Sequence, residues 1–428
     1  MKNKRKYIIL LCPYLIIIAI ISVEMNSDII NKKYSNLNFY SQVGSWIFFC
    51  DDIIKTIQDI VPANKSKMQR NIESFKESRQ ILPYNFEEHE DIENIILIQL
   101  EGIDAVSLEL QYNGQDIMPN LNLLKRNYTY FENAFDQTGS GRTSDGEFLA
   151  LTSLLPITNE SMYLNYELGS IVSLPKILDA HNYQTVSIHG FEGSFYNRLN
   201  VHKELGYQKS YFLEDFKEEA IDSDYIGWGL SDKFILNKVY NLIKEADRKT
   251  FIHAILLSNH HPFDAVSETY DDLLIKNPQN IVEMYLNSIN YTDLMIGELI
   301  ENLQLLNIMD RTLIVIFSDH DSGITSEIYD YFNMEYDDSE SWRYDKIPLI
   351  FCGQTNAHCE DLVVGQAEIM PMILSYLNIE IPDTCMGLNY INGKKVVYKQ
   401  MHNIYAEGID ASLLSMDLIT KSIILYSE

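Results

Sequence analysis

Two apolar runs far apart in the chain end on acidic residues, and this repeated pattern constrains the fold more than any other feature. Residues 94–100 read Asn-Ile-Ile-Leu-Ile-Gln-Leu before Glu101, and residues 311–318 read Arg-Thr-Leu-Ile-Val-Ile-Phe-Ser before Asp319 and His320. Near-continuous apolar runs are typical of strands buried on both faces in a parallel sheet. Because ligands bind at the carboxyl ends of such strands, the pattern predicts that Glu101, Asp319 and His320 meet at one sheet edge.

Helical patterns separate the apolar runs along the chain. They predict helices at residues 118–128, 173–182, 230–246, 281–305 and 366–377, and a further buried strand is predicted at residues 347–352. Short strand-like runs follow from residue 394 onward. Alternating strands and helices are typical of α/β proteins. We therefore predict an α/β domain with a mostly parallel central sheet flanked by helices and a small C-terminal β-rich lobe.

Residues 137–148, Gln-Thr-Gly-Ser-Gly-Arg-Thr-Ser-Asp-Gly-Glu-Phe, place a hydroxyl at a predicted helix entrance. Two glycines loosen the backbone before Thr143, and Ser144 with Glu147 matches the Ser-x-x-Glu capping box of a helix N-terminus. Free backbone N–H groups and the positive end of the helix dipole would favour a phosphate or a developing oxyanion there. Thr143 is therefore a candidate nucleophile. The alternative is a glycine-rich turn with an ordinary capping box.

Glu101, Asp319, His320 and a deprotonated Thr143 would make a mixed oxygen and nitrogen donor set. Such a set suits Mn²⁺ or Mg²⁺, and Zn²⁺ also fits it. A divalent cation lowers the pKa of a coordinated hydroxyl and neutralises phosphoryl charge, which a threonine nucleophile requires. The alternative for each single acid is a strand-end residue that caps a neighbouring helix.

Several motifs share their order and spacing with those of a known enzyme family. They are Leu100-Glu101-Gly102, Met118-Pro119-Asn120-Leu121, residues 137–148, Ser258-Asn259-His260-His261-Pro262-Phe263 and Ser318-Asp319-His320. With them the chain resembles, over residues 90–390, the extracellular domain of lipoteichoic acid synthases. These form a phosphoglycerol transferase group within the alkaline phosphatase and sulfatase superfamily. The Thr-Ser-Asp-Gly-Glu-Phe stretch is the most specific part of the resemblance.

The resemblance implies an alkaline-phosphatase-like fold and a phosphoglycerol transfer reaction. Thr143 would become glycerophosphorylated. The implied ligands of one Mn²⁺-like ion are Glu101, Thr143, Asp319 and His320. The implied donor is a phosphatidylglycerol-type lipid, and the implied acceptor is a hydroxyl of a glycan or polymer. The implied residues of the glycerophosphate pocket are His189, Tyr196, Arg198 and His260.

The pocket residues also have properties of their own. Arg198 is a planar, permanently charged fork that can bind phosphate bidentately. His189 follows a short apolar run and would hydrogen-bond a glycerol hydroxyl or donate a proton to a leaving group. Pro262 disfavours helical backbone at His261, which favours His260 as the inward-facing histidine, although the choice between the two stays open.

Two positions depart from the family pattern. Tyr196 stands where the family usually has tryptophan, so it keeps a stacking face and adds a hydroxyl, and head-group selectivity would differ. After His320 the family commonly continues with an aromatic residue and glycine, whereas this chain has Asp321. Asp321 is either a residue that orients a metal ligand or a solvated charge.

The N-terminus carries the pattern of a membrane anchor. Residues 1–6 include four basic side chains and predict a cytoplasmic tail, and the uncharged residues 7–23 predict a transmembrane anchor. Residues 24–90 then predict a stalk or amphipathic linker, and residues 91–428 predict a catalytic domain outside the cytoplasmic membrane. A cleaved signal peptide is the main rival, but no small-x-small cleavage site follows residue 23.

Charge and cysteines bear on the same location. The formal net charge of −28 opposes binding to nucleic acid and disfavours a general attraction to anionic lipid surfaces. Cys50, Cys352, Cys359 and Cys385 would face an oxidising compartment. One or two disulfides and free buried thiols are both compatible with the sequence.

We predict a membrane-anchored, metal-dependent phosphoglycerol transferase with Thr143 as its nucleophile. Phosphoethanolamine transferases also use a threonine, but they usually bring more metal-site histidines. A phosphodiesterase or sulfatase-like hydrolase is a further alternative, and the Cys/Ser-x-Pro-x-Arg context of sulfatases is absent from the sequence. The alternative from another class is a non-catalytic ectodomain that binds a polymer, and the set of acids, histidine and threonine argues against it.

Overall fold

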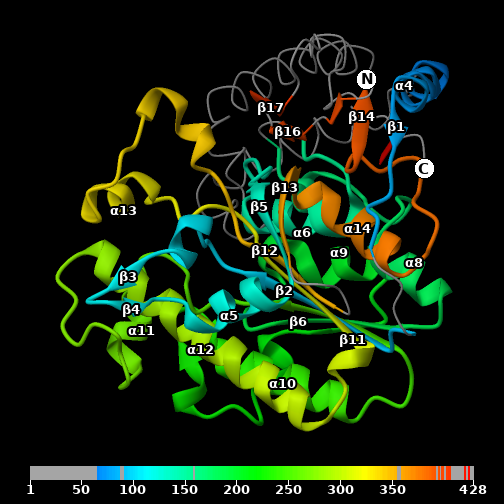
Figure 1. The fold of residues 1–428 in the computed structure, drawn as a ribbon. Helices are drawn as coiled ribbons and strands as arrows, with labels where there is room; N and C mark the ends of the chain where they lie inside the picture. The colour runs from blue at the N-terminus through cyan, green and yellow to red at the C-terminus, as the bar shows by residue number, and fades with distance from the viewer. Residues whose placement is uncertain are drawn as a thin grey trace, which may run out of the picture.

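An eight-stranded sheet organises the part of the chain that the computed structural model describes (Figure 1). That part comprises residues 65–86, 91–157, 160–353 and 358–391, with the short stretches 394–395, 397–399, 402–405, 419–420 and 423–424. The strand order is β13-β5-β12-β11-β2-β10-β6-β7. The strands are β2 (Asn94–Leu100), β5 (Thr129–Phe135), β6 (Gln184–His189), β7 (Lys209–Tyr211), β10 (Thr250–Ile255), β11 (Thr312–Ser318), β12 (Leu349–Cys352) and β13 (His358–Gly365).

The strands of this sheet are parallel with one exception. β2 pairs in parallel with β11 on one side and with β10 on the other, and β6 and β7 continue the parallel series. β12 runs antiparallel between β11 and β5. The predicted α/β class with a mostly parallel sheet is confirmed. Leu100 at the end of β2 pairs with Ser318 at the end of β11, so the residues that follow these two strands are neighbours.

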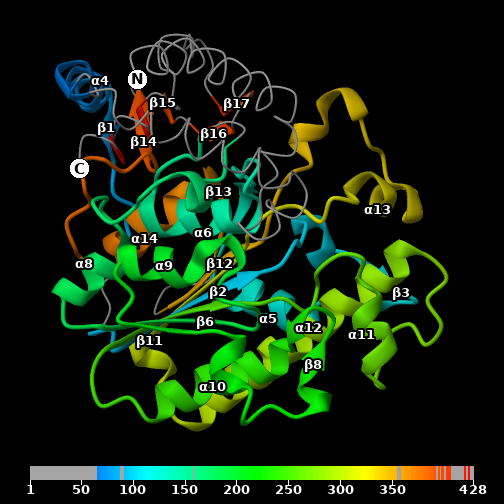
Figure 2. The same ribbon diagram turned by 180° about the vertical axis from the view of Figure 1, so that it is seen from behind.

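Helices cover both faces of the sheet (Figures 1 and 2). Alternate side chains of β2 explain the two layers, because Ile95 and Leu97 join one hydrophobic core and Ile96 and Ile98 join another. The first core includes side chains of α6 (Thr143–Thr152), α8 (Leu174–Ala180), α9 (Arg198–Glu204) and α14 (Ile369–Tyr376), and the second includes those of α5 (Pro119–Asn127), α10 (Asp232–Lys244) and α12 (Ile281–Leu305). The five predicted helices are present, with ends that shift by a few residues.

Smaller elements surround this sandwich. The remaining described helices and strands include α4 (Lys65–Glu77), α7 (Met162–Asn165), α11 (Asp264–Thr269), α13 (Thr325–Tyr331), β1 (Gln80–Ile81), β3 (Gln111–Tyr112), β4 (Gln115–Asp116), β8 (Tyr225–Ile226), β9 (Gly229–Leu230), β14 (Asn389–Ile391), β15 (Lys394–Lys395), β16 (Val397–Lys399) and β17 (His402–Tyr405). β1 pairs with β14, which pairs with β15, and β16 pairs with β17. Ile72 and Phe75 of α4 are buried in the first core, and Ile81, Tyr84 and Phe86 pack against it, so this part of the expected stalk packs on the sheet and its helices.

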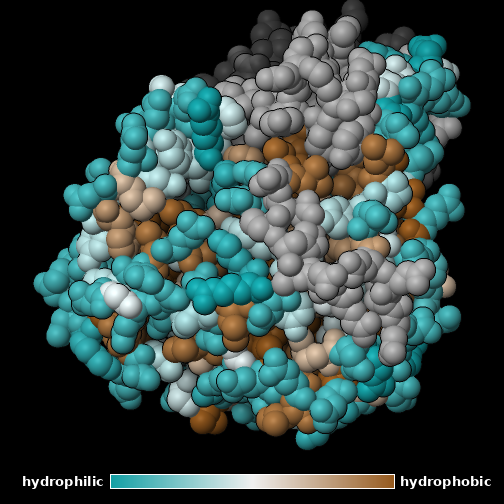
Figure 3. All heavy atoms as spheres, viewed as in Figure 1, coloured by the Kyte–Doolittle hydropathy of each residue, from teal (hydrophilic) through white to brown (hydrophobic). Residues whose placement is uncertain are grey.

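The expected membrane anchor at residues 7–23 lies outside the described residues. Within the described ranges, the helices are all too short or too polar to cross a bilayer. Seen from the side of Figure 1, hydrophilic residues cover much of the described surface, with hydrophobic patches between them (Figure 3).

Two cysteines in the described ranges are free thiols. Cys352 in β12 and Cys385 are both buried, and burial raises the pKa of each thiol. Cys50 lies outside the described residues, so a disulfide and a free thiol both stay open for it.

A buried carboxylate joins α12 to the start of α5. Asp293 accepts hydrogen bonds from the backbone N–H groups of Asn120 at 2.9 Å and Leu121 at 2.7 Å, and from the side-chain amide of Asn120 at 3.0 Å. These N–H groups belong to the first turn of α5, which has no partners for them within the helix. Asp293 therefore holds two helices of the second layer together.

Replacement of this carboxylate should destabilise the fold. We expect Asp293→Ala to lower the free energy of unfolding by about 1–3 kcal/mol, because buried N–H groups lose their acceptor. Denaturant unfolding of the variant beside wild type measures the change. Glu298→Ala, at an exposed site of the same helix, serves as the control and should stay within about 0.5 kcal/mol of wild type. Equal stability of Asp293→Ala and wild type would contradict this role.

Candidate active site

The loop before α6 is shaped by a buried carboxylate of the same helix. Asp145 Oδ2 accepts the backbone N–H groups of Gly139 at 3.0 Å and Gly141 at 2.9 Å. A Cβ atom at Gly141 would overlap the Asp145 carboxylate, which would have to shift to admit any other residue. Arg142 takes a positive φ of 44°, and Thr143 begins the helix. The predicted place of Thr143 at a helix entrance is confirmed.

The predicted capping box is wrong. The Ser144 hydroxyl donates to the carbonyl oxygen of Gly141 at 2.9 Å instead of capping a free N–H group. Glu147 is fully buried and bonds to Arg198 and His202, which lie on α9. A long-range ion pair therefore takes the glutamate that the local motif assigned to the helix end.

The acidic residues and the histidine converge beside Thr143, as the strand pattern predicts. Donor atoms of Glu101, Asp319 and His320 all lie within 4.8 Å of one another, and the three residues are buried. His320 Nε2 is 3.4 Å from Glu101 Oε1 and 3.6 Å from Asp319 Oδ2. Thr143 Oγ1 is 3.4 Å from Glu101 Oε2 and 3.5 Å from His320 Nε2. The four side chains thus surround one point at the carboxyl edge of the sheet.

The hydrogen bonds around this cluster fit a cation. Asp319 Oδ1 accepts the N–H groups of Gly102 at 2.9 Å and His320 at 2.8 Å, whereas Asp319 Oδ2 is buried without a hydrogen-bond partner. His320 Nδ1 lies 2.6 Å from the carbonyl oxygen of Asp321, which only accepts, and 3.1 Å from the Arg142 guanidinium, which only donates. The shorter contact favours a hydrogen on Nδ1. Nε2 then faces the carboxylates. One orphaned oxygen and one directed imidazole nitrogen form a donor set that suits a divalent ion.

The electrostatics of the cluster lead to the same conclusion. Burial raises the pKa of Asp319 to about 7, and the charge of Glu101 adds to this effect. Burial also acts to raise the pKa of Glu101, but hydrogen bonding and charge from His320 outweigh it and lower the value to about 2. For His320 the effect of burial, which lowers the pKa, is outweighed by Asp319 and Glu101, so the value rises to about 9. Two close carboxylates thus attract positive charge, which a divalent cation would supply.

The helix that begins at Thr143 packs tightly against this cluster. A Cβ atom at Gly146 of α6 would lie 2.8 Å from Asp319 Cβ and 3.0 Å from its Cα. The glycine therefore lets the first turn of α6 approach the end of β11 closely. Sequence reasoning missed Gly146, although it lies within the most specific motif.

His189 ends β6 and is buried. Its Nδ1 lies 3.0 Å from the carbonyl oxygen of Ile255 and therefore carries the hydrogen. Burial and the charge of Arg198 lower the pKa of His189 to about 3. The neutral ring leaves Nε2 as an acceptor, which fits a bond from a hydroxyl and disfavours proton donation.

Arg198 lies beneath Tyr196 and is only 1% exposed. Its Nε and Nη2 donate to Glu147 Oε1 at 2.9 and 2.7 Å, while Nη1 is buried without a partner. The ring centroid of Tyr196 lies 5.2 Å from Cζ of Arg198. His189, Tyr196 and Arg198 are thus all buried.

His260 rather than His261 lies near the cluster. It follows β10, is half-buried, and packs its ring 4.1 Å from that of Trp228. His260 is one of the groups that lower the pKa of Glu101. His261 is exposed, and its ring lies 5.4 Å from that of Phe263. His260, which the sequence favoured, is therefore the histidine nearer to the cluster.

Arg142 is a site residue that sequence reasoning missed. Its guanidinium lies 3.3 Å from Asp321 Oδ2 and 3.1 Å from His320 Nδ1. It places positive charge directly beside Thr143. Asp321, which departs from the family pattern, pairs with this arginine, and although burial acts to raise its pKa, Arg142 outweighs that effect and lowers the value to about 2. The signal available in the sequence was a basic residue next to the candidate nucleophile.

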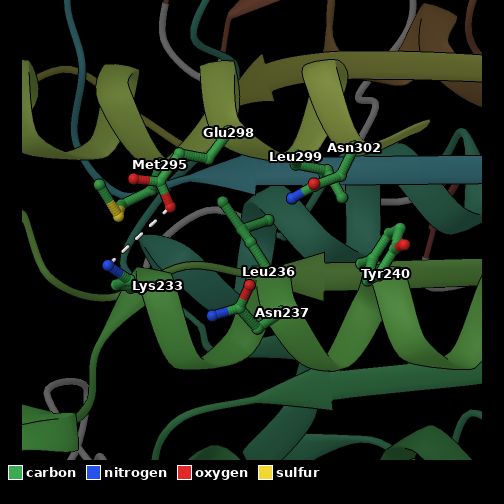
Figure 4. Close-up of a pocket in the computed structure, with 8 residues that line it drawn as sticks. All are labelled: Lys233, Leu236, Asn237, Tyr240, Met295, Glu298, Leu299 and Asn302. Carbon is green, nitrogen blue, oxygen red and sulfur yellow. Dashed lines mark ion pairs between the residues drawn. The ribbon is translucent and has the colours of Figure 1, made fainter. Parts of the chain in front are cut away.

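A separate pocket lies on the other face of the sheet. It forms between α10 and α12 and contains none of the residues described above (Figure 4). Lys233 and Glu298 approach each other across it, with Nζ 4.0 Å from Oε2. This pocket therefore does not overlap the candidate site at the carboxyl edge of the sheet.

Comparison with known proteins decides the family. The sulfatase family model matches residues 93–379, a span that contains every candidate residue of the site. The chain belongs to the sulfatase family. The carboxylates and histidine at the strand ends thus lie in a fold whose members share this arrangement of sheet and helices.

The relatives by sequence include lipoteichoic acid synthases, which confirms the resemblance carried by the motifs. Lipoteichoic acid synthase 2 of Bacillus subtilis (strain 168) is 25% identical over 423 residues, which cover 92% of this chain and 62% of the relative. Lipoteichoic acid synthase of Staphylococcus saprophyticus is 27% identical over 381 residues, which cover 84% of this chain and 57% of the relative. The chain thus spans 62% and 57% of the length of these two relatives.

Solved structures share the fold. The crystal structure of the lipoteichoic acid synthase LtaP from Listeria monocytogenes has a TM-score of 0.67 and 22% identity, and the match covers 84% of this chain and 97% of that one. The Streptococcus pyogenes phosphoglycerol transferase GacH in complex with sn-glycerol-1-phosphate has a TM-score of 0.55 and 17% identity, and covers 84% and 90%. At these identities the likeness establishes the sulfatase-family fold.

The loop glycine offers a direct test of this site. We expect Gly141→Ala to displace Asp145 and with it the loop that leads into Thr143, so that turnover of a phosphodiester falls about 100-fold. Overpacking should lower the free energy of unfolding by about 1–3 kcal/mol. Turnover of bis(p-nitrophenyl) phosphate and thermal denaturation measure the two effects.

Gly169→Ala is the matched control, because a Cβ atom there would meet only the Glu204 side chain at 3.8 Å. It should retain wild-type turnover and stability. Wild-type turnover by Gly141→Ala would show that the geometry of this loop does not govern the reaction.

Proposed function

We propose that the protein is a metal-dependent phosphoglycerol transferase in which Thr143 attacks the phosphorus of a phosphatidylglycerol-type lipid. The observation that carries the proposal is the position of the Thr143 hydroxyl, 3.4 Å from Glu101 Oε2 and 3.5 Å from His320 Nε2. The unpartnered oxygen of Asp319 lies beside them. A hydroxyl held among two carboxylates and an imidazole is suited to nucleophilic attack once a cation is present.

The residues that would hold the cation are Glu101, Thr143, Asp319 and His320. Mn²⁺ is the proposed ion, and Mg²⁺ or Zn²⁺ are alternatives that the same donors accept. When bound, the ion would lower the pKa of the Thr143 hydroxyl and neutralise charge on the phosphoryl oxygens.

The transfer would take place in two steps. In the first, Thr143 Oγ1 forms a bond to phosphorus, the bond to the diacylglycerol oxygen breaks, and the proton lost by Thr143 balances the one gained by diacylglycerol. In the second, the oxygen of an acceptor hydroxyl forms a bond to phosphorus and the bond between phosphorus and Thr143 Oγ1 breaks. The proton lost by the acceptor balances the one that Thr143 regains. The positive end of the α6 dipole and the charge of Arg142 would stabilise the negative oxygens during both steps.

The head group would lie against His189, Tyr196, Arg198 and His260. The neutral ring of His189 would accept a hydrogen bond from a glycerol hydroxyl, and Nη1 of Arg198 would bind a phosphoryl oxygen. Tyr196 would offer its ring face. His260, on the outer side next to Trp228, would close the pocket.

The relatives support the proposed donor and acceptor. Lipoteichoic acid synthases and a phosphoglycerol transferase with sn-glycerol-1-phosphate are among the similar proteins. For this chain we propose a phosphatidylglycerol-type donor and a glycan or polymer acceptor. We also propose that residues 7–23 anchor it in the cytoplasmic membrane, residues 24–90 form a linker, and residues 91–428 act outside the cytoplasm.

Substitution of the nucleophile tests the proposal. The full chain in detergent would be incubated with labelled phosphatidylglycerol and Mn²⁺. Wild type should release diacylglycerol and carry one glycerol phosphate on Thr143 by mass spectrometry. Thr143→Ala should lose at least about 10³-fold in rate and carry no adduct.

Thr152→Ala, at the other end of α6, is the matched control and should react at a rate close to wild type. Release of diacylglycerol by Thr143→Ala at the wild-type rate would refute the nucleophile. Absence of release by wild type, together with turnover of another phosphodiester, would refute the lipid donor alone.

A further inference from the structure

A buried ion pair joins the nucleophile helix to the candidate phosphate-binding arginine. Glu147 lies one helical turn after Thr143 on α6 and is 0% exposed, and Arg198 at the start of α9 is 1% exposed. Nε and Nη2 of Arg198 both donate to Glu147 Oε1, at 2.9 and 2.7 Å. The other oxygen, Oε2, accepts from His202 Nε2 at 3.0 Å. Glu147 is thus fully engaged by two residues of α9.

The guanidinium is only partly satisfied by this carboxylate. Nη1 of Arg198 is buried and has no hydrogen-bond partner. A buried N–H group without a partner costs free energy, and a purely structural ion pair would gain by satisfying it. The Tyr196 ring lies 5.2 Å from Cζ of Arg198, and burial together with the charge of Arg198 lowers the pKa of His189. The guanidinium therefore lies next to Tyr196 of the candidate pocket and keeps one nitrogen unpaired.

We propose that Glu147 is a positioning residue that holds Arg198 by one edge, so that Nη1 is presented to the phosphoryl group of the substrate. The inference rests on the proposed function for the identity of that ligand. A single carboxylate oxygen takes two of the three nitrogens, and a phosphoryl oxygen takes the third. Because Glu147 and Thr143 belong to the same short helix, the pair also fixes the distance between the nucleophile and the phosphate that it attacks.

The chemistry of the pair explains why arginine and glutamate are both needed. Only a planar guanidinium offers separate edges to two anions, whereas the ammonium of lysine is a point charge that serves one of them. The carboxylate also keeps a charged side chain in a buried place before the substrate arrives. Buried ion pairs contribute little net stability on their own, which is consistent with a role in binding.

Binding of phosphate compounds without turnover tests this role. The full chain in detergent, with Thr143→Ala to prevent reaction, would be titrated with sn-glycerol 1-phosphate and with inorganic phosphate in the presence of Mn²⁺. Glu147→Gln should weaken binding of both probes about tenfold or more, because the charge that holds Arg198 is lost. Mn²⁺ affinity should stay at the parent value, since Glu147 does not face the cluster of acids.

A second substitution keeps the test decisive if Glu147→Gln folds poorly. Arg198→Lys should lose affinity for both probes to a similar extent while it keeps a positive partner for Glu147. Ethylguanidinium should restore phosphate binding to Arg198→Ala, and it should fail to do so when Glu147→Gln is added. A structural role alone would not make this chemical rescue depend on Glu147.

Asp293→Asn is the matched control, because Asp293 is an equally buried carboxylate on the opposite helical layer. It should lower thermal stability and leave both phosphate and Mn²⁺ affinities unchanged. Parental phosphate affinity in folded Glu147→Gln, or failure of the parent protein to bind either probe, would overturn the inference.

These results separate the inference from the proposed function. Glu147-dependent phosphate binding in a protein that consumes no phosphatidylglycerol would uphold the positioning role and reject the donor. Thr143-dependent consumption of the lipid, with parental phosphate affinity in Glu147→Gln, would uphold the function and reject the positioning role.

Discussion

The parallel pairing of β2 with β11 is the constraint on which the rest of the site depends. Their register sets Leu100 opposite Ser318, so the chain leaves both strands at the same edge, with Glu101 following one and Asp319 and His320 following the other. The backbone thereby brings two carboxylates and an imidazole together within 4.8 Å. Side chains far apart in sequence need no flexible loop to meet. The geometry of the cluster is a property of the sheet, which is buried on both faces.

The start of α6 lies beside the same cluster. Two buried carboxylates at close range attract positive charge, and although burial acts to lower the pKa of His320, they raise it to about 9. The start of α6 brings the positive end of a helix and the guanidinium of Arg142 to that place. Thr143 lies between these sources of opposite charge. In the proposed reaction, this hydroxyl would lose its proton and attack a phosphate.

Local pattern was enough to predict the cluster and the class of fold. The apolar runs that end on acids, and the glycine-rich turn before Thr143, are visible in this sequence alone. The antiparallel direction of β12 could not be predicted, because an apolar run does not show whether a strand is parallel to its neighbours. Glu147 was misread as a cap because its partner Arg198 is 51 residues away. The resemblance assigned three pocket residues, His189, Tyr196 and Arg198. Their burial depends on tertiary packing, which no local pattern contains.

Anomalous diffraction from crystals grown with Mn²⁺ tests the central claim most directly. The account predicts one strong manganese peak among Glu101, Thr143, Asp319 and His320, with oxygen and nitrogen ligands at about 2.0–2.3 Å. Crystals of Asp319→Asn should show a weaker peak or none at that position. A cluster without a peak, in crystals where Mn²⁺ occupies another site of the chain, would contradict the account.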